Sequence, residues 1–80
     1  MEPKLKKGDI IKAEQTVDLI NITAGDRYKV ESLKQDFYEP RYSLRRCNES
    51  GRGKIGATLE LAITSLDFWI QDGSIQRERE

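Results

Sequence analysis

The clearest pattern along the chain is an alternation of apolar and charged positions that follows a turn signal. Gly25 and Asp26 are typical turn residues, because glycine adopts positive φ at no steric cost and aspartate hydrogen-bonds its own backbone. Tyr28 and Val30 then alternate with three charged residues. Since successive side chains of a strand point to opposite faces, this stretch predicts a strand with one apolar face.

A second alternation begins after Pro40, whose missing amide hydrogen suits the start of a strand. In the stretch 41–47, Tyr42 and Leu44 fall on one face, and arginine and serine side chains fall on the other. The segment 48–53 that follows contains two glycines, which favours a hairpin turn. The pattern therefore predicts a strand that leads into a hairpin.

The longest alternation covers residues 54–63. The apolar positions are Ile55, Ala57, Leu59, Leu61 and Ile63. We favour a strand here, paired with the stretch 41–47 upstream. A helix over residues 57–72 stays open as the alternative, because no glycine or proline interrupts them and a second apolar set recurs at helical spacing. That set consists of Leu59, Ala62, Ile63, Leu66 and Ile70.

The remaining segments predict shorter elements. A first strand is expected at residues 10–13, and the largely apolar residues 19–22 would cover one end of a barrel or add a short strand. A single 3-10 turn at 64–67 would precede a last strand at 68–71. The expected organisation is a flexible N-terminal segment at 1–7, one barrel at 8–72 and a polar C-terminal tail at 73–80.

Together these elements predict a mainly β fold, a small five-stranded SH3-like barrel with a single 3-10 turn before the last strand. Three motifs support this: Gly8-Asp9-x-Ile11, then Ile22-Thr23-x-Gly25-x-x-Tyr28-x-Val30, and Leu66-x-Phe68. On these motifs the chain resembles small SH3-like barrels of uncharacterised bacteriophage and prophage proteins. The resemblance covers roughly residues 8–70 and implies a barrel of phage origin, but it carries over no active site. The chain lacks the acidic loop and paired tryptophans that bind polyproline ligands in eukaryotic SH3 domains.

Composition argues against an enzyme and against a metal protein. The chain has 80 residues, which suits one domain, and contains no histidine, so the commonest general base and metal ligand is missing. No cofactor is expected. The single cysteine, Cys47, allows no intramolecular disulfide and suits a reducing compartment. No apolar run is long enough to span a membrane. We therefore expect a cytoplasmic protein, located in the host cytoplasm if phage-encoded.

Two surfaces are candidates for binding a partner, and the first is aromatic. If Phe68 and Ile70 face the core of a last strand, Trp69 faces outward, and an exposed tryptophan is a typical interface anchor. Phe37 and Tyr38 are further candidates for this surface. The expected partner is another protein, or a second copy of the chain.

The second candidate surface is basic and makes nucleic-acid binding the alternative function. Its cations are Arg41, Arg45, Arg46, Arg52 and Lys54, with Tyr42, Phe37 and Tyr38 nearby. Guanidinium groups bind phosphates and aromatic rings stack on bases. The chain as a whole has 14 basic and 14 acidic residues and no net charge, which weighs against binding driven by bulk charge.

Overall fold

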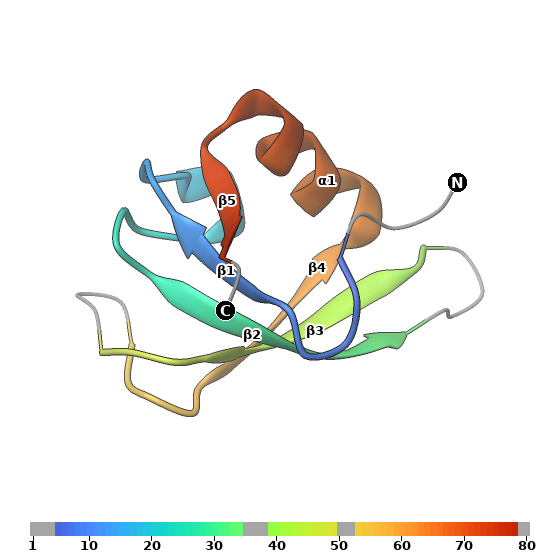
Figure 1. Cartoon of the computed structure of the whole chain (residues 1–80), viewed down its shortest axis with the longest axis horizontal. Helices are drawn as coiled ribbons and strands as arrows, with labels where there is room; N and C mark the ends of the chain where they lie inside the picture. The colour runs from blue at the N-terminus through green and yellow to red at the C-terminus, as the bar shows by residue number, and fades with distance from the viewer. Residues whose placement is uncertain (1–4, 35–38, 50–52, 79–80) are drawn as a thin grey trace.

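A five-stranded antiparallel sheet curls into a half-barrel in the computed structural model of the chain, which describes residues 5–34, 39–49 and 53–78 (Figure 1). The strands are β1 (Ile10–Ala13), β2 (Arg27–Lys34), β3 (Arg41–Arg46), β4 (Thr58–Ala62) and β5 (Ile75–Glu78). Their order in the sheet is β4-β3-β2-β1-β5, so β4 and β5 form its two edges. The predicted mainly β fold with five strands is therefore confirmed.

The two central strands have the predicted alternation. Tyr28 and Val30 of β2 are buried, as are Tyr42 and Leu44 of β3, and the residues between them on the outer face are exposed or partly exposed. Burying these side chains contributes roughly 1.5–3 kcal/mol each relative to leaving them in water. The inner face of this pair thus forms the floor of the core.

The turn before β2 is held by its own aspartate, as the sequence predicts. Oδ2 of Asp26 accepts a hydrogen bond from the N–H of Thr23 at 2.8 Å. Gly25 adopts a φ of 93°, a conformation that strains any residue with a Cβ atom. Asp26 itself is fully buried, so this turn delivers a charged side chain into the core.

The C-terminal half differs from the prediction. The strand β4 is confined to Thr58–Ala62, and residues 63–72 form the helix α1 (Ile63–Asp72) instead of a 3-10 turn and a strand. Ile55, expected in the core, is 64 % exposed in a turn. Both patterns in this stretch are real, but each applies to one part of it: alternation up to residue 62, and helical spacing beyond it.

A stripe on α1 explains why the helix forms. Ile63 and Leu66 are buried and Ile70 is partly buried, which matches the spacing of one helix face. The helix lies between the two edges of the sheet and contacts both β4 and β5 (Figure 1). Gly73, with a φ of 93°, ends it and donates its N–H to the C=O of Ile70.

The two ends of the chain also contribute to the fold. Residues 75–78, expected within a polar tail, form β5 and pair antiparallel with β1, which brings Ile75 into the core opposite Ala13. Leu5, expected in a flexible segment, is buried at 1 % exposure. The 3-10 helix η1 (Asp18–Ile20) precedes β2 rather than the last strand. In the described part of the chain no helix is long and apolar enough to cross a membrane.

Candidate functional site

An apolar cavity of about 410 Å³ lies between η1 and α1, and we call it the η1–α1 groove. It is lined by Leu19, Ile20, Thr64, Ser65, Phe68 and Trp69. Among the described residues, only three large apolar side chains are strongly exposed, and two of them, Leu19 at 85 % and Phe68 at 58 %, line this groove. Apolar exposure is thus concentrated at one place on the surface.

The helix decides which aromatic residue faces the groove. A strand would turn Phe68 into the core and Trp69 outward, but the segment is a helix, on which Phe68 is exposed and Trp69 is half-buried. On a helix whose buried face includes Leu66, position 68 lies about 200° further round and faces solvent. Trp69 is half-buried against the core, and its ring meets that of Phe68 edge to face with centroids 5.0 Å apart.

Phe37 and Tyr38, the other predicted partner-binding residues, lie outside the described residues. Leu19 and Phe68 were missed as binding residues. For Phe68, the sequence did contain a signal, namely the helical spacing of apolar residues over 57–72. If the helix had been preferred there, Phe68 would have fallen on its outer face. For Leu19, no sequence pattern distinguishes it from the neighbouring Ile20, which is buried.

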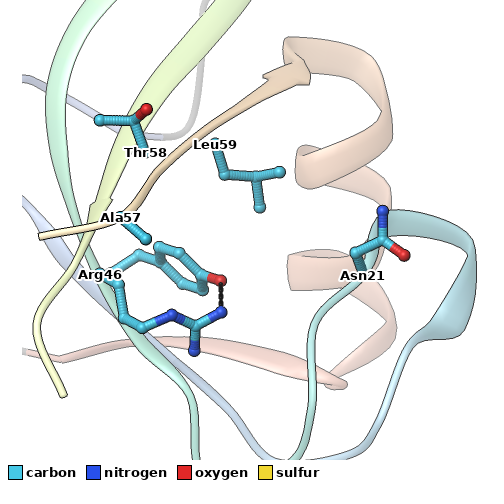
Figure 2. A pocket seen from close by; sticks show the side chains of 6 residues that line it. Asn21, Arg46, Ala57, Thr58 and Leu59 are labelled. Carbon is cyan, nitrogen blue, oxygen red and sulfur yellow. Dashed lines mark hydrogen bonds between the residues drawn. The ribbon is translucent and has the colours of Figure 1, made fainter. Parts of the chain in front are cut away.

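A second cavity of about 470 Å³, which we call the Arg46 pocket, opens beside β4 (Figure 2). Its lining residues are Asn21, Tyr28, Arg46, Ala57, Thr58 and Leu59. In Figure 2, Leu59 of β4 and Asn21, which follows η1, flank the pocket, while the Arg46 side chain lies at one side of it. The lining combines apolar surface with amide, hydroxyl and guanidinium groups.

Arg46 is held inside the half-barrel by three kinds of interaction. Its Nη1 lies 3.0 Å from Oδ1 of Asp26, and both side chains are almost fully buried. Its Nη2 donates a hydrogen bond of 2.6 Å to the hydroxyl of Tyr28, and the guanidinium lies 4.9 Å from the centre of that ring. A Cβ added at Gly53 would lie 3.0 Å from Nε of Arg46, so the backbone there also packs on the guanidinium.

The predicted basic surface does not assemble as expected. Arg46 points inward, whereas Arg45 on the outer face pairs with Glu31. Arg52 lies outside the described residues, and Lys54 is exposed.

Arg41, the remaining member of the predicted basic set, lies on the outer face at the far end of β3, 3.9 Å from Glu60. Glu60 also accepts a hydrogen bond of 2.7 Å from Lys34. This hydrogen bond and the charge of Lys34 lower the pKa of Glu60, with a smaller contribution from Arg41.

Another buried polar cluster lies at the opposite end of β3 from Arg46. The hydroxyl of Tyr42 donates to Oδ1 of Asp67 at 2.9 Å and accepts a hydrogen bond from the N–H of Leu5 at 3.2 Å. Asp67 is 6 % exposed. The cluster ties α1 and the N-terminal segment to β3, which is a structural role.

No group of three or more acidic or cysteine side chains in the described ranges lies close enough to bind a metal ion. No family model, curated protein or solved structure matches this chain. Its function must therefore be argued from its own surfaces.

Proposed function

We propose that the chain is a non-enzymatic binding module whose partner is another protein, and that the η1–α1 groove receives an apolar side chain of that partner. The observation that carries the proposal is the pair Leu19 and Phe68, exposed on the two walls of one cavity. Large apolar side chains grouped in this way mark interaction sites, whereas single exposed ones need no explanation.

The half-buried Trp69 supports the same surface. Its ring forms part of the groove while packing against the core, so the groove has a wall that does not reorganise freely. Rigid aromatic side chains in such positions contribute strongly to binding, because little conformational freedom is lost when the partner docks.

Nucleic-acid binding, the alternative from the sequence, receives less support. Arg41 and Arg45 approach acidic side chains on the outer face, and the buried Arg46 pairs with Asp26. The phage resemblance, the SH3-like relationship and the cytoplasmic location all stay predictions.

The experiment is a selection of binding peptides from a displayed library of random peptides, followed by affinity measurements with variants of the full chain. Leu19→Ala and Phe68→Ala remove the two groove side chains. Ile55→Ala is the matched control, because Ile55 is the third strongly exposed apolar residue and lies in a turn away from the groove. All three positions are exposed, so folding should change by less than about 0.5 kcal/mol.

We expect affinity to fall by about tenfold or more in the two groove variants and to stay unchanged in Ile55→Ala. Recovery of no peptide, or equal affinities for all three variants, would overturn the proposal. Binding of single- or double-stranded DNA or RNA at low salt that weakens steeply as salt is raised would instead favour the nucleic-acid alternative.

A further inference from the structure

The strand β4 presents an unpaired edge. It pairs with β3 on one side and, among the residues that the structure describes, with no strand on the other. The N–H of Ile63 donates to the C=O of Pro40 at 2.9 Å. This bond shows which residues of β4 direct their N–H and C=O groups toward β3. Because ladder bonds in an antiparallel pair involve every second residue of a strand, the odd-numbered residues bond to β3. The N–H and C=O groups of Thr58 and Glu60 therefore point away from the sheet.

The Arg46 pocket lies along this edge, and the η1–α1 groove lies just past its end, beside the first turn of α1. Residues 57–59 line the Arg46 pocket and residues 64 and 65, just after β4, line the η1–α1 groove. The opposite wall is shared as well, because residues 19 and 20 line the groove and Asn21 lines the pocket (Figure 2). The two cavities are thus successive parts of one seam, with residues 19–21 on one side and β4 followed by α1 on the other.

We propose that the partner binds as an extended segment that adds a strand to the free edge of β4 and places an apolar side chain in the η1–α1 groove. The inference rests on the proposed function and specifies the form of the partner. An added strand lies about 4.8 Å from β4 and supplies the complementary N–H and C=O groups. Side chains four residues apart on one face of a strand are about 13 Å apart, so one segment would offer side chains to successive parts of the seam.

The seam favours a single extended segment over a second copy of the chain. The wall formed by residues 19–21 lies across the seam from β4 and α1, and a second copy would have to accommodate this wall with its own sheet and loops. Symmetric pairing of two β4 strands centred on Glu60 would also set two carboxylates opposite each other, which is unfavourable. A lone segment meets neither obstacle.

The charges on the outer face of the sheet indicate which residue type the bound segment carries beside the end of β4. Lys34, Arg41 and Ala62 are neighbours across the sheet, and the free edge comes next in this row. The Arg41 side chain is 50 % exposed and lies 3.9 Å from Glu60, whereas Lys34 binds Glu60 at 2.7 Å. Because Glu60 already accepts the close hydrogen bond of Lys34, the charge of the more distant, half-exposed Arg41 is only partly balanced. A segment with an acidic residue beside Ala62, adjacent in sequence to its apolar anchor, matches this charge.

The direct test is amide hydrogen exchange of the full chain, measured by NMR with and without a peptide selected from the displayed random library. Strand addition should slow exchange of the Thr58 and Glu60 amides by about tenfold or more. The amides of Leu59 and Leu61, which already bond to β3, serve as internal controls and should change little.

A matched pair of variants isolates the backbone contribution. Glu60→Pro removes an N–H that β3 does not use, and proline is tolerated at such edge positions, whereas Glu60→Ala removes the same side chain and keeps the N–H. We expect the proline variant to bind the peptide about tenfold more weakly than the alanine variant. If the proline variant does not fold, N-methylation of the peptide at successive residues replaces it, and binding should fall at every second position.

The outcomes separate this inference from the proposed function. Equal affinities of the two Glu60 variants, or an N-methyl scan without alternation, would overturn strand addition. If Phe68→Ala still weakens binding in that case, the groove stands as the protein-binding site. Binding that is insensitive to Phe68→Ala would overturn the groove anchor, and with it the proposed function.

Discussion

Arg45 and Arg46 are adjacent in the sequence, and the structure gives them opposite environments. Arg45 is on the outer face of β3, where its side chain is 53 % exposed and pairs with Glu31. Arg46 is on the inner face, where it is 5 % exposed and pairs with the fully buried Asp26. The same chemical group is thus a solvated surface charge at one position and an internal structural element at the next.

The difference teaches that the position of a residue along the strand, and not its type, decides which face its side chain occupies. Successive positions alternate between the two faces, and we call this alternation the parity of the strand. Tyr42, Leu44 and Arg46 share the inward parity of β3. A charge in that position is tolerated only with a partner, because an uncompensated buried charge is very costly. Asp26 directly precedes β2, two residues before the buried Tyr28, and its side chain points to the same inner face, which is why the two charges meet.

The largest expected effect comes from breaking the inner pair. Arg46→Met should destabilise the fold by about 3–5 kcal/mol, because it leaves the buried Asp26 carboxylate uncompensated. Urea unfolding followed by circular dichroism measures this loss. Adding Asp26→Asn should restore part of the lost stability, since the amide still accepts from Thr23 without burying a charge. A single Arg46→Met variant as stable as the natural chain would contradict the proposed role of the pair.

The polar cluster at the other end of β3 should be next in size. Tyr42→Phe removes only the hydroxyl that joins Asp67 and Leu5, so it should cost about 1–3 kcal/mol. Thermal and urea unfolding of this variant are compared with those of Arg46→Met. A larger loss of stability in Tyr42→Phe than in Arg46→Met would contradict the expected order of the two effects.

The outer arginine should matter least for stability. Arg45→Met breaks an exposed ion pair with Glu31 and should change the free energy of unfolding by less than about 1 kcal/mol. The same urea measurement, repeated at low and high salt, checks this, since screening weakens exposed pairs. A loss as large as that of Arg46→Met would show that parity does not separate the two arginines.

The smallest effect concerns titration on the outer face. The hydrogen bond and charge of Lys34 hold the pKa of Glu60 below its ordinary value of 4.5. A lowered pKa in the folded state means that this contribution to stability is present above that ordinary value and is lost as pH falls through the folded pKa. Lys34→Gln should raise the pKa of Glu60, as an NMR titration of its carboxyl carbon would show.

Arg41→Gln is the control for that titration. Arg41 makes the smaller contribution and lies 3.9 Å from Glu60, so its removal should raise the pKa less than the removal of Lys34 does. A larger rise after Arg41→Gln would reverse the assignment of the cause.

Much of the central sheet was predictable, and most of the candidate site was not. The turn at Gly25 and the alternating stretches of β2 and β3 need only local geometry and period-two patterning. The η1–α1 groove depends on a helix that competed with a strand over the same residues. A strand there would turn Trp69 outward and Phe68 inward, whereas the helix exposes Phe68 and leaves Trp69 half-buried at the groove.

The inner arginine shows a different kind of miss. Its parity was visible in the sequence, but Arg46 was grouped with the other cations of its strand because charged residues are rarely buried. Only the register of β2 and β3, which sets Tyr28 opposite Arg46, shows that a buried carboxylate is within reach. A pair separated by some twenty residues carries no local signal.

By itself the sequence determined the element type wherever one periodicity was unopposed: the strands around Tyr28 and Tyr42, the turn before them, and the mainly β class. The tertiary structure alone decided the rest. It turned residues 63–72 into a helix, because that stripe packs between β4 and β5, and it made a strand of residues 75–78 by pairing them with β1. The physical reason is that a short segment with two compatible patterns, or with none, takes the conformation that buries it best against distant parts of the chain.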